Sequence, residues 1–296
     1  MKFGKLENID QVDFTLPEDR VIFEADPSDS IKIYTGATSW NKNEWKGVLY
    51  PEKAKKADFI RHYGKQFNSI ELNATHYRTP SDQTIETWVN ETPDDFRFCP
   101  KVLQAISHRH NMLSNENLVN NFIVQLSKLG KKMGQTFLQL PPYFKYESLP
   151  YLKSFLKSWP EEIPLAIELR NEEMHNNENY FEAYIDILSQ YHCTPLITDV
   201  SGRRDLMHMT LNGPKVFIRW VGNGLHPSDY ARILEWKERI KTWKQYGVQE
   251  VYFMLHEPDN LKTPEIAEIF SKELENIQYI DQRGPKLIQE QPNLFS

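Results

Sequence analysis

FNSIELNATHY, residues 67–77, reads as a buried strand that ends in polar side chains. Phe67, Ile70 and Leu72 give the stretch its apolar, strand-forming body. Glu71 and Asn73 are two residues apart, so in a strand their side chains lie on the same face. Burying a carboxylate and an amide without partners costs several kcal/mol. The stretch therefore predicts that other parts of the chain, or a ligand, supply polar partners at its end.

The rest of the chain alternates between strand-like and helix-like segments. Apolar strand-like runs occur at 31–37, 67–73, 96–102, 135–140, 165–170, 194–200, 215–220 and 250–255. Helix-like stretches lie between most of them, at 54–66, 81–91, 116–132, 149–157, 178–190, 228–246 and 264–277. Such alternation is typical of parallel βαβ units, and eight strands favour closure into a ring. We therefore predict an α/β fold, a single-domain TIM (β/α)8 barrel over residues 31–280.

The two ends of the chain differ from this body. Residues 1–30 carry eight acidic and three basic side chains, and we interpret them as an acidic extension that packs on the barrel or is partly mobile. Residues 281–296 are polar, and we expect a flexible tail. No apolar run is long enough for a membrane span or a signal peptide, which predicts a cytoplasmic protein. The two cysteines stand in apolar runs, as expected of reduced core thiols.

In a TIM barrel the active site is built at the carboxyl ends of the strands, and here those ends are unusually polar. They supply three kinds of groups. These are the carboxylates Glu71, Glu168 and Asp199, the cations Lys101, Arg170 and Arg219, and the amides and titratable or aromatic groups Asn73, Gln139, His76, Tyr77 and His256. Opposite charges of this kind could simply neutralise one another. Buried ion pairs are poor stabilisers compared with apolar packing, so a cluster of this size indicates a functional pocket.

These residue types suit general acid and base chemistry on a small anionic or sugar-like substrate. The predicted enzyme is a hydrolase, lyase or isomerase without a redox cofactor. We assign catalytic roles to Glu71, Glu168, Lys101 and Asp199, and substrate binding to the other cations, amides and rings, namely Asn73, His76, Tyr77, Gln139, Arg170, Arg219, Trp40 and His256. A divalent metal on the carboxylates and His256 is the alternative, but three interleaved cations would compete for those carboxylates. We therefore expect no metal or other cofactor.

The first long loop, SWNKNEWKGVLYPEKAKK at residues 39–56, mixes aromatic and basic residues. Trp40, Trp45 and Tyr50 could stack a base or a sugar while the lysines meet phosphate, which would suit a nucleic acid. In the other interpretation the tryptophans close the top of the barrel and the lysines are solvated. The sequence leaves both interpretations open.

Several motifs together resemble the DUF72 family, also called YecE-like proteins. They are GATSWNKNEWKGVLYP (36–51), FNSIELNATHYRTPS (67–81), FRFCPKVLQAISH (96–108), LQLPP (138–142) and AIELR (166–170). The resemblance covers about residues 31–275 and implies a TIM barrel, without implying a particular activity. Seven of the polar residues named above fall where the resemblance places them, namely Glu71, Asn73, Lys101, Gln139, Glu168, Arg170 and Asp199.

The last residues hold one further motif. Gln291, Leu294 and Phe295 in QPNLF resemble the short peptide by which bacterial replication and repair proteins dock on the sliding clamp. This gives an alternative hypothesis, a nucleic-acid or DNA-repair-associated protein that binds the clamp through its tail.

Overall fold

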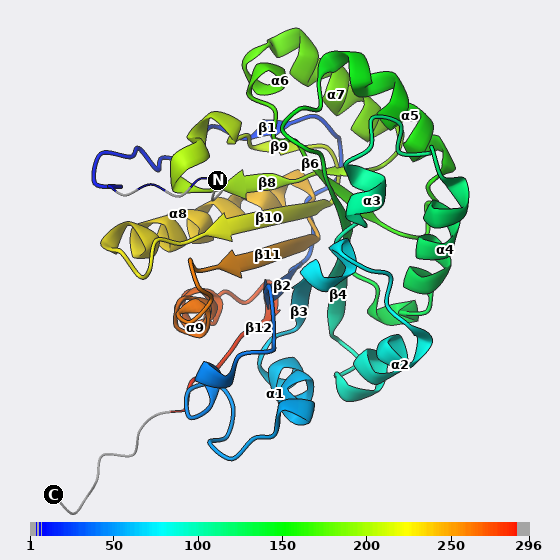
Figure 1. Cartoon of the computed structure of the whole chain (residues 1–296). Coiled ribbons are helices and arrows are strands. Elements are labelled where there is room, and N and C mark those ends of the chain that lie inside the picture. Colours follow the sequence, from blue (N-terminus) through cyan, green and yellow to red (C-terminus); the bar gives the residue numbers. More distant parts are fainter. Residues whose placement is uncertain (1–3, 5, 7, 289–296) are drawn as a thin grey trace, which may run out of the picture.

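The computed structural model describes residues 4, 6 and 8–288, which form an α/β fold with parallel strands. Its long strands lie inside and the helices outside, so that α2, α4, α5 and α7 arc around one side of the strands and α8 and α9 cover another (Figure 1). The helices are α1 (Phe59–Gln66), α2 (Asp82–Glu91), α3 (Gln104–Ser107), α4 (Glu116–Ser127), α5 (Leu149–Ser158), α6 (Glu172–Asn176), α7 (Glu178–Gln190), α8 (Pro227–Trp243) and α9 (Thr263–Leu274).

All eight predicted strands occur, and the sixth is split in two around Leu196. They are β2 (Ile31–Ala37), β3 (Ser69–Leu72), β4 (Arg97–Pro100), β5 (Thr136–Gln139), β6 (Leu165–Glu168), β7 (Thr194–Pro195), β8 (Ile197–Asp199), β10 (Lys215–Val221) and β11 (Glu250–His256). Three further strands lie outside these eight runs, namely β1 (Arg20–Val21), β9 (Thr210–Leu211) and β12 (Ile280–Arg283). Two of these lie in the segments assigned to the extension and the tail.

The strands pair in three parallel sheets. The largest runs β4-β3-β2-β11-β10-β8 with β12 beside β2, the second is β5-β6-β7, and β1 pairs with β9. Backbone hydrogen bonds also join β4 to β5, from Gly134 N to Phe98 O over 2.8 Å and from Val102 N to Phe137 O over 2.9 Å. The predicted α/β fold is confirmed, whereas the strand pairing of the described residues does not form one continuous closed barrel sheet.

Alternate residues of these strands meet in an apolar cluster inside the curve of the sheets. The cluster consists of Tyr34, Cys99, Phe137, Ala166, Leu196, Phe217, Tyr252 and Met254. The intervening strand residues pack outward against the helices in two larger cores. Both cysteines are buried and free, and burial raises the pKa of each thiol to about 12.

Both ends of the described chain pack on the body. In the extension, Leu16 is buried and the Phe14 ring lies 4.8 Å from the Arg232 guanidinium. β12 pairs with β2, and Arg283 binds the Asp95 carboxylate with its Nε and Nη2 atoms at distances from 2.9 to 3.1 Å. The described part of the segment that we expected to be a flexible tail is therefore hydrogen-bonded to the fold, because β12 continues the parallel pairing.

Candidate functional site

A layer of polar side chains lies directly above the inner apolar cluster, at the carboxyl ends of the strands. Each of these residues follows an inward-facing apolar residue by two positions, so each faces the same interior. They are Lys101 after Cys99, Gln139 after Phe137, Glu168 after Ala166, Thr198 after Leu196, Arg219 after Phe217 and His256 after Met254. Glu71, at the end of β3, joins this layer through its hydrogen bonds to Arg219 and His256.

Arg219 on β10 is the centre of the layer. Its Nε and Nη2 atoms donate to the two carboxylate oxygens of Glu71 over 2.8 and 3.0 Å. Its Nη1 atom donates to both oxygens of Glu168, over 3.1 and 3.2 Å. All three nitrogen groups of the guanidinium are therefore bound to carboxylates of the protein. Burial alone would lower the pKa of Arg219, but the two carboxylates outweigh burial and raise it.

The two carboxylates are completely buried and stay ionised. Burial alone would raise their pKa values, but nearby positive charge outweighs it. The Arg219 charge, together with hydrogen bonds from Arg219 and His256, holds the pKa of Glu71 well below its usual range. Arg170, Arg219 and Lys101 lower the pKa of Glu168 to about 2. Neither group therefore carries a proton near neutral pH.

Further hydrogen bonds fix the orientation of each carboxylate. Asn73 Nδ2 donates to Glu71 over 2.9 Å. Thr198 Oγ1 donates to Glu168 over 3.1 Å, and Arg170 Nη2 lies 2.9 Å from the same Glu168 oxygen. The predicted partners of the Glu71 and Asn73 pair are thus found on several strands, together with one residue, Thr198, that sequence reasoning missed.

His256 is held by Glu71, with Nε2 3.0 Å from a carboxylate oxygen. Arg219 Nη2 also lies 3.5 Å from Nε2, but the contact with Glu71 is shorter. Because an ionised carboxylate can only accept, the shorter contact favours the neutral tautomer with its proton on Nε2 and its lone pair on Nδ1. Burial lowers the pKa of His256, which keeps the ring neutral near pH 7 although the Glu71 charge acts in the opposite direction. The arrangement is a carboxylate-oriented imidazole, which suits a general base.

Lys101, directly after β4, differs from the other cations of the layer. Its Nζ atom donates to Gln139 Oε1 over 2.7 Å, and it lies in none of the ion pairs within 4.0 Å found among the described residues. Burial, followed by the positive charge of Arg219, lowers the pKa of Lys101 to about 8. The Phe137 ring lies below both cations, with its centre 5.6 Å from Lys101 Nζ and 5.6 Å from the Arg219 guanidinium carbon.

The remaining predicted binding residues differ in position and in exposure. His76 Nδ1 contacts the Val102 carbonyl oxygen over 2.8 Å, and burial lowers the pKa of His76 to about 4. Tyr77 is exposed and contacts the edge of the His76 ring. Trp40 packs its ring against Tyr63 and Trp88, which makes it part of the outer core.

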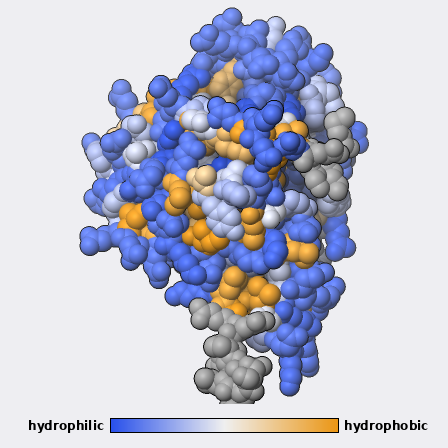
Figure 2. Space-filling view, turned by 90° about the vertical axis from the view of Figure 1, so that its left-hand side faces the viewer, coloured by the Kyte–Doolittle hydropathy of each residue, from blue (hydrophilic) through white to orange (hydrophobic). Residues whose placement is uncertain are grey.

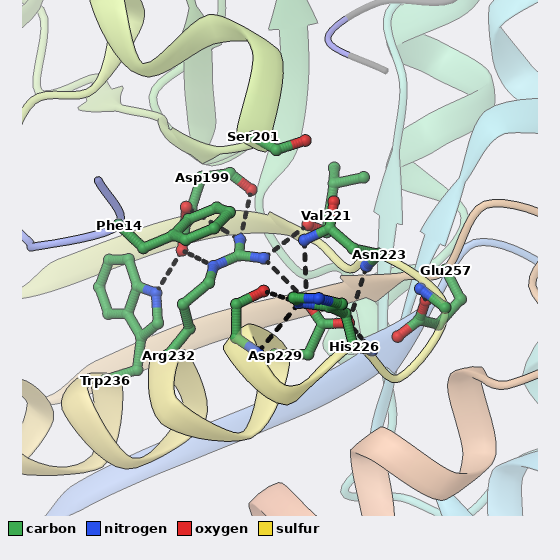
Figure 3. A network of polar contacts seen from close by, with 12 residues as sticks. Phe14, Asp199, Ser201, Val221, Asn223, His226, Asp229, Arg232, Trp236 and Glu257 are labelled. Atoms are coloured by element: carbon green, nitrogen blue, oxygen red, sulfur yellow. Dashed lines mark hydrogen bonds and ion pairs between the residues drawn. The ribbon is translucent and has the colours of Figure 1, made fainter. Parts of the chain in front are cut away.

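Asp199 does not join the central layer, which corrects our grouping of it with Glu71 and Glu168. It ends β8 one residue after the inward-facing Thr198, so its side chain points outward toward α8. There it accepts from Trp236 Nε1 over 2.7 Å and pairs with Arg232 over 2.9 Å (Figure 3). It also pairs with Arg204. These residues, together with Asp229 and Phe14, form a separate buried cluster beneath the extension.

Exposure within the central layer is uneven. Glu71 and Glu168 have no exposed surface, whereas Lys101 and Gln139 are each 8% exposed. The side chains of Arg170 and His256 are 13% and 16% exposed. The arrows of β8, β10 and β11 in Figure 1 point to the face that Figure 2 shows. On this face, exposed hydrophobic residues form patches among mostly hydrophilic ones. The exposed surface of the layer therefore belongs to its cations, an amide and an imidazole, and none of it to the two carboxylates.

Comparisons with known proteins agree with the resemblance seen in the motifs. The model of the family described as "Protein of unknown function DUF72" matches residues 34–289. This chain belongs to the DUF72 family. The UPF0759 protein YecE of Escherichia coli (strain K12) is 27% identical over 260 residues, which cover 82% of this chain and 92% of that protein. The UPF0759 protein YunF of Bacillus subtilis (strain 168) is 31% identical over 147 residues, which cover 47% of this chain and 51% of that protein.

Solved DUF72 structures share the fold. A DUF72 family protein from Enterococcus faecalis V583 matches with a TM-score of 0.67 and 20% identity, covering 88% of this chain and 100% of that one. A DUF72 family protein from Thermotoga maritima MSB8 matches with a TM-score of 0.66 and 22% identity, covering 83% of this chain and 100% of that one. The likeness at this level of identity concerns the fold alone.

In this DUF72 chain the aromatic residues of the first loop are mostly buried. Trp45 donates from Nε1 to the Asn260 carbonyl oxygen over 3.1 Å, and Tyr50 donates to the Trp40 carbonyl oxygen over 2.7 Å. Both side chains are buried, so neither presents a face for stacking a base. Trp45 stacks on Tyr63 and Tyr50 packs on Phe59, so these two rings belong to the outer core beside α1.

Phe137 and Glu257 had no predicted role in the site. Glu257, which directly follows His256 at the end of β11, is buried and accepts from Gly224 N over 2.8 Å. Burial raises the pKa of Glu257 to about 7, with Asp229 adding to the effect. The sequence shows Glu257 as a polar residue at a strand end, whereas its contact with the loop and the place of Phe137 beneath the two cations depend on the tertiary fold.

Other features of the DUF72 chain bear on cofactors and partners. Among the described residues, no three His, Cys, Asp or Glu side chains are grouped as metal ligands. Of the helices in the described part of the chain, none is long and apolar enough to cross a membrane. The QPNLF motif with Gln291, Leu294 and Phe295 lies outside the described residues.

Proposed function

We propose that this protein is an enzyme that binds a small anionic substrate at Arg170 and Lys101 and transfers a proton through His256. One observation carries the proposal. In the strand-end layer both carboxylates are buried and bound within the protein, while the cations and the imidazole retain the exposed surface. The substrate side of the site therefore offers positive charge and a base.

The charges of the layer support an anionic ligand. Glu71 and Glu168 contribute two negative charges, and Arg219, Arg170 and protonated Lys101 contribute three positive charges. With His256 neutral, these five side chains carry one net positive charge. A carboxylate or a phosphate group would balance it through hydrogen bonds from ionised donors, which are stronger than bonds between neutral groups.

The pKa values revise the roles that the sequence suggested for the two glutamates. A carboxylate with a pKa of about 2, as for Glu168, is a weak base and lies far from the range that favours proton transfer near pH 7. The Glu71 and His256 pair fits the task better, because Glu71 fixes the ring and leaves Nδ1 as the acceptor. We assign Glu71 and Glu168 to positioning and His256 to proton transfer.

This set of groups favours an isomerase or a lyase. Removal of a proton next to a carbonyl or a carboxylate builds negative charge on oxygen, and preorganised cations such as Arg170 and Lys101 stabilise that charge. A hydroxylated, sugar-like skeleton is compatible with the amides Asn73 and Gln139, which orient hydroxyl groups.

We also infer that the strands form a TIM-type barrel whose mouth is this site. The hydrogen bonds between β4 and β5 support the inference at one junction, and the Leu196 N to Ile167 O bond of 2.9 Å supports it where β7 continues into β8. Placement of the polar layer at the carboxyl ends of the strands agrees with where such barrels carry their sites.

Exchange of the carbon-bound hydrogens of small anions for deuterium tests the proposal. The native protein is incubated in D2O with small carboxylates and sugar phosphates, with pyruvate and glucose 6-phosphate as first probes, and carbon-bound deuterium is read by NMR. We expect exchange that His256→Gln abolishes and that Arg170→Met weakens through a higher KM. The exposed His110 provides the matched control His110→Gln, which keeps full exchange. Exchange that is unaffected by His256→Gln would overturn the assignment.

A further inference from the structure

We propose that Lys101 forms an imine with the carbonyl carbon of its substrate, so that the substrate is an anionic aldehyde or ketone such as a 2-oxo acid. The inference rests on the proposed function, since it uses the same site and the same anion-binding cations. It adds a covalent step and narrows the substrate class from small anions to carbonyl-bearing anions.

The contacts of Lys101 leave its amine available for attack on a carbonyl. Within the described residues its Nζ atom has one side-chain partner, the neutral oxygen of Gln139 at 2.7 Å. The nearby carboxylates of Glu71 and Glu168 are bound by Arg219, and Arg170 adds to the contacts of Glu168. Desolvation and neighbouring cations lower the pKa of a lysine, which is how proteins activate a lysine amine as a nucleophile.

The surroundings of Lys101 increase the fraction of neutral amine. With a pKa of about 8, roughly one amine in ten is neutral at pH 7. An ordinary lysine has about one neutral amine in 3,000 at the same pH. The arginines cannot act in its place, because a guanidinium remains protonated and is not a nucleophile.

The backbone holds Lys101 in a fixed place. Its N–H donates to the Leu72 carbonyl over 3.2 Å, and its own carbonyl accepts from Thr75 Oγ1 over 2.8 Å. The Phe137 ring lies beneath the side chain and excludes water from that side. A rigid, partly dry amine at the strand ends can therefore meet a carbonyl group whose anionic end is held by Arg170.

The covalent step balances without another reactant. The lone pair of neutral Nζ attacks the carbonyl carbon, and the two hydrogens of the amine leave with the carbonyl oxygen as one water. The resulting imine, once protonated, withdraws electrons from the neighbouring carbon, so that a proton there is lost more easily to His256. The imine would therefore make the proposed proton transfer easier, which explains why a lysine lies at this site.

A second buried lysine provides an internal control. Lys132 is as buried as Lys101 and its pKa is also lowered, first by burial. Its Nζ atom, however, donates to the carbonyl oxygens of Val89 and Thr92 over 2.6 and 2.5 Å. Because these acceptors hold the ammonium away from the strand ends, Lys132 is expected to stay unmodified.

Borohydride trapping tests the inference. The native protein is mixed with pyruvate or glyoxylate, reduced with borohydride, and analysed by intact mass and peptide mapping. We expect one reduced adduct per chain, located on Lys101, with labelling of Lys132 at least about tenfold lower at pH 7. The rate of labelling rises with pH and levels off above pH 8, in line with the Lys101 pKa. A reduced adduct spread over surface lysines, with none on Lys101, would overturn the inference.

The Lys101→Arg variant separates the inference from the proposed function, since it keeps the charge and cannot form an imine. We expect calorimetry to show that this variant still binds pyruvate while trapping is lost. If native protein binds pyruvate and exchanges its protons but is not trapped, the imine is wrong and the proposed function stands. If native protein binds neither pyruvate nor glyoxylate, the proposed anion site itself is wrong. Mapping of the native protein needs no variant, so a folding defect in Lys101→Arg does not affect that test.

Discussion

Arg219 binds Glu71 through two parallel hydrogen bonds of 2.8 and 3.0 Å, although the two residues are 148 positions apart in sequence. They stand on β10 and β3, and β2 and β11 lie between those strands in the sheet. A side-chain pair can span two intervening strands only if the sheet curves and both side chains point to its inside. The pair therefore reports the curvature of the fold as well as the position of the site.

Arg219→Met should destabilise the protein by about 3–5 kcal/mol, because it leaves two buried carboxylates without their shared cation. Chemical denaturation at pH 7 measures the free energy of unfolding. The matched control is Arg61→Met, which removes an exposed arginine from its 2.6 Å pair with Glu91 and should cost far less. Equal costs for the two variants would show that the central arginine is not needed for stability.

Glu168 should make stability depend on pH in the acid range. Its pKa is about 2 in the folded protein and near 4.5 when unfolded, so its contribution is fully present above pH 4.5 and is lost as pH falls toward 2. The free-energy difference between native protein and Glu168→Gln should therefore narrow over this window. Denaturation of both proteins from pH 7 to pH 3 measures it, and a constant difference would contradict the lowered pKa.

Asp199→Ala should affect stability and leave anion binding unchanged. Removal of Asp199 takes a carboxylate from the fully buried Arg232 and an acceptor from Trp236, at a cost of about 3–5 kcal/mol. Denaturation and a pyruvate titration of the folded variant measure the two effects. Loss of binding in a protein of native stability would place Asp199 back in the central site.

The His256 base should stay neutral at a lower pH than an ordinary histidine. Only the neutral ring accepts a proton, and burial lowers its pKa below 6.5. More than half of the His256 rings should therefore still be neutral at pH 6.5. NMR titration of the imidazole, with His256→Gln used to assign its signals, measures this, and a midpoint at or above pH 6.5 would show a pKa that is not lowered.

Gly36→Ala should destabilise the sheet by about 1–3 kcal/mol through overpacking. A Cβ atom on Gly36 would lie 2.8 Å from the Ser69 carbonyl group and 2.8 Å from Met254 Sδ. Gly213→Ala is the matched control, because a Cβ there has no neighbour within 4 Å. Thermal unfolding compares them, and a larger effect at Gly213 would contradict the close packing at Gly36.

Sequence patterns predicted the eight strand runs and the polar residues at their ends because these depend on local properties. Burial of a parallel strand on both faces requires a short apolar run, and a polar residue that ends such a run is visible without a structure. In this way the sequence indicated seven site residues before their contacts were known, namely Glu71, Lys101, Gln139, Glu168, Arg170, Arg219 and His256. The motifs likewise indicated the DUF72 family, which the comparisons confirm.

The sequence by itself determined which residues could take part, and the tertiary structure decided which of them meet. Asp199 shows the difference, because Leu196 and Ile197 are both apolar and both buried, so alternation in that strand gives no sign of which face is inward. Only the register against neighbouring strands turns Thr198 toward Glu168 and Asp199 toward Arg232. The pKa values of Lys101 and Glu168 have the same origin, because burial and through-space charge depend on distances between strands that no local pattern contains.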